Sequence, residues 1–541
     1  MTNQNNYPFY GWIPKPLGAA ILVLFFVPLF FSGGTYLSNV NIMAGGMGIL
    51  TEDFQFLSFC VSIGMSLVFP FMIPYLQARN VKHVYLGGFA SLIVLNWICA
   101  NTQSLPLLAG CCFVIGFIRV GLTLNTTFII APYALGVNTI DMFTREAATP
   151  EAAFQGEHAR TVLMPILYTY ILILVQGSNY VMVWVAHEFR WEYSYYFAIG
   201  LLLAAMLITL VAFCPAPTRR WNIKYSRLAD ALLLAAAMGG FCYMMVYGKT
   251  YDWFDSPRIW TAFILTLVCG GAFLWLEART PECPLLESGT FRHRNTWIAI
   301  GIFLLTMLIN SSTLFVTTFV RLSTNAGELE SAAISCWAIP GLLAGLVLSL
   351  VFVRRHVPFR YIYATGFGLM LCANLYMYFQ YQTMGVYEHS IFPTIIHWTG
   401  MLLLYSIPCA FALKHIPIRY FATWLFLMVA VRNVVATAIG TSVYGNWLQE
   451  RQQHYITRLA QDIRSDNPVA SSRFLVTAHM GQAQGQSTFE ADRLAATSMK
   501  GQLTLQATLV AMKDITGSTI WICLACTAFI LLIPYYKNER T

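Results

Sequence analysis

The sequence is poor in charged residues. Asp, Glu, Lys and Arg make up only 10% of the 541 residues, whereas soluble globular domains carry about 25%. Apolar residues make up 57%, and the mean hydropathy is +0.60. This shortage of charge excludes an ordinary soluble domain and predicts a chain that crosses a bilayer several times. Because the net charge of +8 is spread over the segments between apolar runs, we expect no nucleic-acid partner.

Motifs for catalysis and cofactor binding are also missing. The sequence contains no HExxH pair, no GxSxG elbow and no paired Cys/His cluster for a metal. Gly248, Lys249 and Thr250 resemble the end of a phosphate-binding loop, but Tyr243 stands where that loop needs its first glycine. We therefore expect no enzyme activity, no cofactor and no ATP hydrolysis. Gradient-driven transport becomes the leading class of function.

Long apolar runs are what the sequence has in quantity. A spanning helix needs about 20 mostly apolar residues. Fourteen such runs are centred roughly on residues 30, 65, 92, 118, 174, 203, 237, 267, 308, 341, 370, 402, 432 and 526. The sequence therefore predicts an all-α integral membrane protein with 14 transmembrane helices. An even number of spans places both termini on the same side of the membrane.

Lys and Arg residues collect on one side of this arrangement. Nineteen of them fall on the terminal segments and on one set of loops, while the short loops of the opposite side hold four. A further six lie in the long polar segment 447–512, but long loops cross the membrane largely regardless of charge. Because cytoplasmic loops collect positive charge, both termini are predicted to be cytoplasmic and segment 447–512 external.

Four stretches of the sequence carry a family resemblance. They are RNVVATAIGTSVYGNWLQERQQHYITRLAQDI at 432–463, YDWFDSP at 251–257, FRWEYSYYFAIGLL at 189–202 and LQATLVAMKD at 505–514. In order and spacing, over nearly the whole chain, they resemble the fourteen-spanning drug:proton antiporters of the major facilitator superfamily, which include the Emr-type multidrug exporters. The resemblance implies a major facilitator fold in a bacterial cytoplasmic (inner) membrane. It also implies alternating access to a mid-membrane site and protons as the coupling ion.

The same resemblance implies a domain organisation. Residues 1–215 are expected to form an N-terminal six-helix bundle and residues 291–541 a C-terminal one, with two inserted helices and a linker at 216–290. Segment 447–512 is expected to be an external helical arm of the C-terminal bundle, with an irregular tip at DNPVASS and HMGQAQGQS. The arm either docks to a periplasmic adaptor that leads to an outer-membrane channel or packs on itself as a cap over the outer mouth.

The sequence lacks acidic residues that the family has at positions connected with proton coupling. Ala78 stands at the family's Asp position in the loop after the second span, and the first span, GGTYLSNVNIMA, has no acid. None of the 24 acidic residues lies at the centre of a predicted span. Asp514 resembles the acid at the start of the family's last helix and is our candidate for coupling. Two alternatives stay open: a dedicated metabolite exporter with altered or lost proton coupling, and a transporter-like sensor or scaffold.

Arg119 is a charged residue within an apolar run, FVIGFIRVGLTL at 113–124. Ionisable groups at membrane depth are costly and are functional candidates by default. The family's arginine in this helix would fall near Cys112, seven residues earlier, so Arg119 presents the same helix face about 10 Å nearer the cytoplasm. We interpret Arg119 as a relocated coupling or substrate-contacting charge. Anchoring by hydrogen bonds to helix carbonyls is the alternative.

Polar residues in other spans complete the set of substrate and coupling candidates. Arg432 and Asn433 begin the first matched stretch, and His397 can titrate near neutral pH. The remaining candidates carry amide, hydroxyl or phenol groups: Asn310, Thr313, Gln176, Asn179, Tyr180, Asn39 and Asn41. For each of them, a satisfied hydrogen bond within the helix packing is the alternative. Together they predict a binding site for an amphipathic or hydrophobic small molecule.

Overall fold

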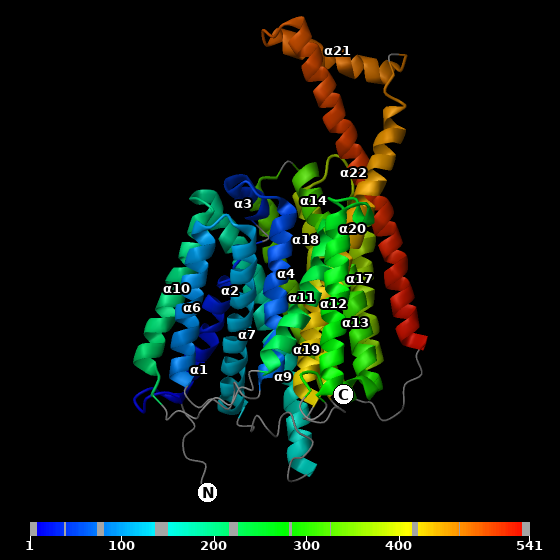
Figure 1. Ribbon diagram of the computed structural model, residues 1–541. Helices are drawn as coiled ribbons and strands as arrows, with labels where there is room; N and C mark the ends of the chain where they lie inside the picture. Colours follow the sequence, from blue (N-terminus) through cyan, green and yellow to red (C-terminus); the bar gives the residue numbers. More distant parts are fainter. Residues whose placement is uncertain are drawn as a thin grey trace.

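The structure is a computed structural model that describes residues 8–36, 39–72, 81–135, 150–215, 226–280, 284–324, 326–413, 420–464 and 466–532. Ala78 lies outside the described residues. The described chain is almost entirely helical (Figure 1), with one isolated β-bridge between Phe9 and Phe213. The prediction of an all-α membrane protein is confirmed.

In the first part of the chain, residues 1–215, the described residues form eight α-helices of the membrane body. They are α1 (Lys15–Leu24), α2 (Phe26–Phe31), α3 (Val40–Met47), α4 (Thr51–Leu67), α6 (Val81–Asn101), α7 (Leu105–Leu135), α9 (Pro150–Glu188) and α10 (Glu192–Ala212). Two further helices, α11 (Ser226–Tyr247) and α12 (Pro257–Arg279), pack on each other, and α11 also packs on α4 and α20.

The second part of the chain completes the body and builds the arm. Its helices are α13 (Arg294–Asn310), α14 (Thr313–Ser323), α15 (Glu328–Ala333), α16 (Ala338–Arg354), α17 (Phe359–Gln380), α18 (Ile391–Leu413), α19 (Phe421–Ala430), α20 (Thr437–Ala460), α21 (Pro468–Ala483) and α22 (Thr488–Leu532). Short 3-10 helices are η2 (Phe69–Phe71), η3 (Trp253–Asp255), η4 (Ser288–Arg292), η5 (Ile334–Trp337) and η6 (Tyr387–Ser390), and η8 (Val431–Ala436) is a π-helix.

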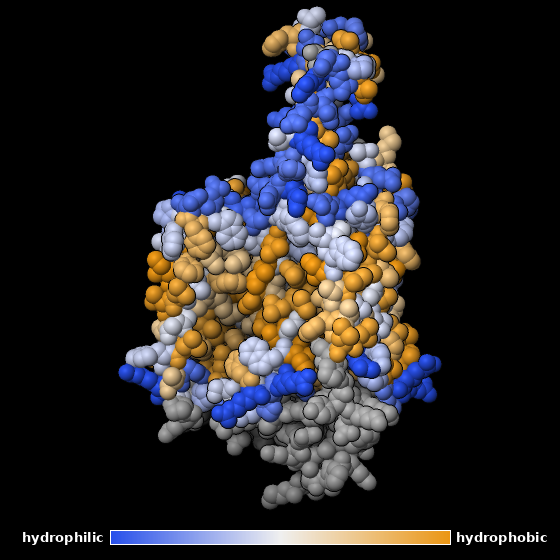
Figure 2. Space-filling model, turned by 90° about the vertical axis from the view of Figure 1, so that its right-hand side faces the viewer, coloured by the Kyte–Doolittle hydropathy of each residue, from blue (hydrophilic) through white to orange (hydrophobic). Residues whose placement is uncertain are grey.

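Thirteen helical stretches of the described chain are long and apolar enough to cross a membrane. The first predicted span differs, because it consists of the shorter apolar stretch Lys15–Phe31, divided between α1 and α2. Pro28 has no N–H for the carbonyl of Leu24, which is the last residue of α1. On the face seen in Figure 2, apolar side chains form a belt across the body, as expected of a surface that faces lipid.

Helices α4 and α7 approach each other at two glycines. A Cβ atom on Gly64 would overlap the carbonyl oxygen of Phe113, and a Cβ atom on Gly116 would overlap that of Val61. Small residues allow such backbone contact between membrane helices. The contact also brings the residue after Gly64, Met65, within reach of Arg119 on α7.

The two parts of the chain share a hydrophobic core. One continuous buried cluster includes Leu67 of α4, Tyr168 of α9, Cys409 of α18 and Trp424 of α19. Helix α9 packs on α16 and α18, and α4 packs on α19. On the face from which the arm projects, the contact is polar, since Asn41 donates a hydrogen bond of 3.1 Å to Glu328 Oε1.

The arm stands off one face of the body (Figure 1) and is formed by the end of α20, by α21 and by the first part of α22. The expected irregular tip is wrong over Pro468–Ala483, which form the regular helix α21, whereas residues 484–487 are non-helical as predicted. Asn467 caps it by accepting hydrogen bonds from the backbone N–H groups of Val469 and Ala470, at 3.0 and 3.5 Å. Pro468 at the first helical position is a further helix-start signal that the polarity of DNPVASS obscured.

Candidate functional site

A cavity of about 190 Å³ is lined mainly by residues of the second part of the chain, with one residue from the first part. Gln176 of α9 is the lining residue from the first part. The second part supplies Ser312, Thr313, Val316, Thr317, Ile334, Ser335, Ala373, Asn374, Met377, Tyr381, Pro393, Thr394, His397 and Trp398. The lining combines hydroxyl and amide groups with apolar side chains, and among the described residues it contains no Asp, Glu, Lys or Arg.

His397 and Asn310, two of the predicted candidates, form a hydrogen-bonded pair beside this cavity. The Nε2 atom of His397 lies 3.2 Å from Asn310 Oδ1, so the imidazole donates when that nitrogen is protonated. His397 is only 5% exposed. The structure thus brings together Gln176, Thr313 and His397 on the lining, with Asn310 directly behind His397.

Helices α13 and α14, which carry Asn310 and Thr313, meet in a turn beside the cavity. Helix α13 ends at Asn310 and α14 begins at Thr313, with Ser312 in the turn between them. The Ser312 hydroxyl donates to Asn374 Oδ1 of α17 at 3.3 Å. Ser311 and Ser312 keep right-handed helical dihedral angles, so α13 and α14 together form one span, Arg294–Ser323. Asn374 was not among our candidates, although an amide inside the apolar run LMLCANLYMY was a visible signal.

Arg432 lies in the π-helix η8 and is only 3% exposed. Its Cζ atom is 3.6 Å from the ring centre of Tyr405, 5.1 Å from that of Tyr168 and 5.6 Å from that of Phe303. We call these three side chains, from α18, α9 and α13, the aromatic cage. Cation–π contacts stabilise a desolvated guanidinium, and Tyr168 is the cage residue that comes from the first part of the chain.

Arg119 lies inside the first part of the chain and not on the cavity lining. Its Nη2 atom is 3.5 Å from Met65 Sδ, and its Cζ atom is 5.5 Å from the ring centre of Phe30. The Nε atom is buried and has no hydrogen-bond partner. Within the described part of the chain, no carboxylate forms an ion pair with either Arg119 or Arg432.

The remaining membrane candidates lie elsewhere. Asn39 is 1% exposed and donates to the carbonyl of Met182 at 2.8 Å, which fastens it inside the first part of the chain. Asn41 is exposed on the arm face, and Asn433 Oδ1 accepts a 3.4 Å hydrogen bond from Arg432 Nε. Asn179 and Tyr180 are half-buried on α9, three and four residues after Gln176.

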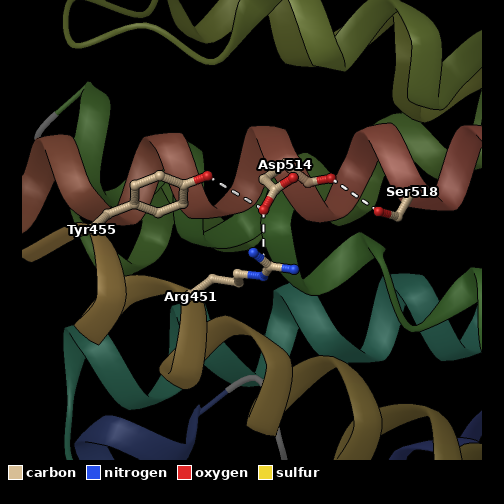
Figure 3. A network of polar contacts seen from close by, with 4 residues as sticks. All are labelled: Arg451, Tyr455, Asp514 and Ser518. Carbon is tan, nitrogen blue, oxygen red and sulfur yellow. Dashed lines mark hydrogen bonds and ion pairs between the residues drawn. The ribbon is translucent and has the colours of Figure 1, made fainter. Parts of the chain in front are cut away.

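Asp514 lies at the base of the arm and not at the cavity. Figure 3 shows Arg451 and Tyr455 of α20 pointing towards its carboxylate on α22. Arg451 Nε and the Tyr455 hydroxyl are each 3.4 Å from Asp514 Oδ2. The side chains of Arg451 and Asp514 are 43% and 36% exposed, so this ion pair is a surface contact of small energy.

A buried carboxylate that we did not predict lies at the start of α4. Asp53 is 9% exposed, accepts a 2.9 Å hydrogen bond from the backbone N–H of Leu50 and accepts another from the hydroxyl of Tyr247 on α11. Its tertiary partner is 194 residues away in the sequence.

A multi-pass helical body, an apolar belt on the face seen in Figure 2 and a cavity lined by hydroxyl and amide groups are the features expected of a membrane transporter. The chain is 22% identical over 538 residues to the fatty acid resistance protein FarB of Neisseria gonorrhoeae, which covers 98% of this chain and 97% of FarB. It is 23% identical over 496 residues to the multidrug export protein EmrB of Escherichia coli K12, covering 88% and 89%.

Structural similarity supports the predicted major facilitator fold. The tetrameric peptide transporter PepTSo2 superposes with a TM-score of 0.52 and 13% identity, over 96% of this chain and 98% of that one. No protein-family model matches the chain. The predicted resemblance to the Emr-type exporters is confirmed by the similarity to EmrB and FarB.

Proposed function

We propose that this protein is a secondary active transporter that exports amphipathic or hydrophobic small molecules by alternating access. The observation that carries the proposal is the cavity itself. Its lining combines Gln176 from the first part of the chain with residues from the second part, so a movement that separates the two parts removes Gln176 from the lining. EmrB is named a multidrug export protein and FarB a fatty acid resistance protein, which supports export of this class of cargo.

The moving parts in this proposal are residues 1–215 and 291–541, with the pair α11 and α12 of 216–290 inserted between them. Contacts between the parts exist on both sides of the cavity: the shared apolar core away from the arm, and the Asn41–Glu328 hydrogen bond on the arm face. Alternating access requires these two sets of contacts to break in turn. The positive-inside rule supports cytoplasmic termini and an external arm in a bacterial cytoplasmic membrane.

Protons are the proposed coupling ion, in keeping with the family resemblance. A second candidate is a dedicated exporter with altered or lost proton coupling. It is favoured by one observation, namely that the lining, as far as the structure describes it, contains no carboxylate. A periplasmic adaptor at segment 447–512 is a proposed partner. Exposed apolar side chains on the arm, such as Phe489 at 75% and Met480 at 61%, support such docking.

Transport by the purified protein in liposomes tests the proposal. A fluorescent amphipathic dye is followed with and without an imposed pH gradient, and we expect movement that depends on the protein and accelerates with the gradient. Trp398→Ala, on the cavity lining, should lower the rate at least several-fold. Trp521→Ala, which removes a 71% exposed side chain from the surface of α22, is the matched control and should leave the rate unchanged.

Two results separate the alternatives. Dye movement that ignores the pH gradient retains the exporter and removes proton coupling. Absence of any protein-dependent movement, for a protein that remains folded by size-exclusion chromatography, removes the transporter and leaves the sensor or scaffold.

A further inference from the structure

A groove of about 580 Å³ lies where the arm meets the body, between α14, α20 and α22 (Figure 1). We call it the arm groove. It is lined by Thr318 and Leu322 of α14, by Leu448 and Gln452 of α20, and by the face of α22 that runs from Thr497 to Thr508. Small-molecule sites usually have volumes of about 300–1,000 Å³, so the arm groove is large enough for a molecule of drug size.

Helix α14 separates the arm groove from the cavity. The cavity side of α14 carries Thr313, Val316 and Thr317, whereas the groove side carries Thr318 and Leu322. At about 100° per residue, the two sets point in directions about 170° apart. A single helix, about 10–12 Å across, is therefore the wall between the two spaces.

The end of α14 is tied to the first part of the chain. Arg321 of α14 forms an ion pair of 2.5 Å with Glu328, and Glu328 accepts the hydrogen bond from Asn41 of α3. Separation of the two parts on the arm face breaks the contact with Asn41. Opening on that face therefore removes a restraint on the α14 wall.

The threonines of the arm groove present hydrogen-bond acceptors. The hydroxyl of Thr318 donates to the carbonyl of Leu314 at 2.7 Å, and that of Thr504 donates to the carbonyl of Lys500 at 2.9 Å. A hydroxyl whose proton is engaged in this way keeps an oxygen lone pair for a partner. On the cavity lining, the Thr313 hydroxyl likewise donates to a carbonyl of its own span, at 2.8 Å. Both spaces therefore suit a ligand that donates hydrogen bonds.

The rest of the groove lining is mostly apolar and carries one cation. Leu322, Leu448 and Leu505 provide hydrocarbon surface, and Lys500 is the charged residue among the lining residues that the structure describes. Because like charges repel, Lys500 disfavours a ligand with a cationic head. The lining as a whole therefore suits an uncharged amphiphile whose head carries hydroxyl groups.

We propose that the arm groove is a second binding site, which receives uncharged, hydroxyl-bearing amphiphiles such as alkyl glycosides from the cavity when α14 moves aside. The head donates hydrogen bonds to the threonine oxygens, and the alkyl chain lies on the three leucines. The inference rests on the proposed function and adds an exit site and a chemical class of cargo to it. Export then takes two steps, from the cavity past α14 and from the arm groove to the solution beside the arm.

A photoreactive alkyl glucoside, with a diazirine in its eight-carbon chain, locates the site. It is applied to the full-length protein in phosphatidylcholine nanodiscs, and the labelled peptides are identified by mass spectrometry. We expect labelling of the groove segments 448–452 and 497–508 and of the cavity segment 394–398, and an excess of unlabelled glucoside should lower both several-fold. An alkylammonium probe with the same chain should label the groove segments several-fold less. These comparisons use the unmodified protein and do not depend on whether a variant folds.

A variant that fills the arm groove tests the exit route. At Gly501 a Cβ atom would meet no other atom within 4 Å, so the ring of Gly501→Phe enters the groove without displacing the backbone. This variant should lose labelling of the groove segments, keep that of the cavity segment and release radiolabelled glucoside from liposomes several-fold more slowly. Gln502→Phe places the same ring on an exposed neighbouring residue that does not line the groove. This control should behave as the unmodified protein does.

Each other result has a definite meaning. Cavity labelling without groove labelling, or groove labelling that unlabelled glucoside does not reduce, overturns the second site and leaves the proposed function standing. Stronger groove labelling by the alkylammonium probe overturns the assigned cargo chemistry. Normal release by Gly501→Phe, with its groove labelling lost, overturns the exit route. If neither space is labelled and no dye moves in the liposome assay, the proposed function falls together with the inference.

Discussion

Replacement of Tyr168 by leucine should open the transporter on the side away from the arm. Tyr168 is the aromatic-cage residue that belongs to the first part of the chain, while Arg432, Tyr405 and Phe303 belong to the second. Its contacts with the second part exist only while the two parts are closed on that side. Tyr168→Leu therefore destabilises that closed state and leaves the open state untouched.

The magnitude follows from two interactions of the Tyr168 ring that leucine cannot make. The ring centre lies 5.1 Å from the Arg432 guanidinium, and a desolvated cation–π contact contributes about 1–2 kcal/mol. The edge-to-face contact with Tyr405, at 5.2 Å, adds about 0.5–1 kcal/mol. A destabilisation of about 2 kcal/mol shifts the ratio of open to closed protein by about 30-fold.

Distances between spin labels measure this shift. One label replaces Val211 near the end of α10, and the other replaces Val351 near the end of α16; both side chains are exposed. Tyr168→Leu should increase the population with the longer distance. Phe303→Leu removes a cage contact within the second part and should lower thermal stability without moving the populations.

Two results would contradict the prediction for Tyr168→Leu. The first is an unchanged distance distribution in Tyr168→Leu. The second is an equal shift in Phe303→Leu, which would mean that the cage responds to general loosening and not to separation of the two parts.

Three further predictions concern the packing and the arm. Gly116→Leu should abolish recovery of folded protein, because the side chain overlaps a carbonyl oxygen of α4 and overpacking costs about 1–3 kcal/mol or more. The control is Gly110→Leu, where the space is open; it should yield normal amounts of protein by fluorescence-detected chromatography. Tyr247→Phe should lower the free energy of unfolding by about 1–3 kcal/mol, because it removes one of the hydrogen-bond donors to the buried Asp53 carboxylate. A double-mutant cycle with Asp53→Asn that gives no coupling energy would contradict this prediction. Asp514→Asn should cost at most about 1 kcal/mol and retain gradient-driven dye transport, whereas loss of transport in a folded variant would assign Asp514 to coupling.

The fold was largely predictable because lipid imposes one requirement on every span. Long apolar runs identified the spanning helices, and the first predicted span is the shorter apolar stretch that Pro28 divides. At the arm tip the polar composition indicated an irregular segment, although Asn467 and Pro468 together are a local helix-start signal.

The site was predictable only in part, since it depends on contacts between distant segments. Gln176, Thr313, Asn310 and His397 were identified as polar residues in apolar runs, but their convergence on one cavity requires the packing of α9, α13 and α18. The partners of Arg432 were not predictable, because aromatic residues are frequent in every span. Nothing local distinguishes Tyr168 or Tyr405 from the others.

Alternating access, as proposed here, requires that one cavity opens to each side of the membrane in turn. A single cysteine in place of Thr394, on the cavity lining, tests it in a background in which the thirteen native cysteines are replaced. A membrane-impermeant maleimide is applied separately to each side of oriented vesicles. We expect the cysteine to react from both sides, and we expect an opposing cargo gradient to change the ratio of the two rates. Reaction from one side alone, under every gradient, would contradict it.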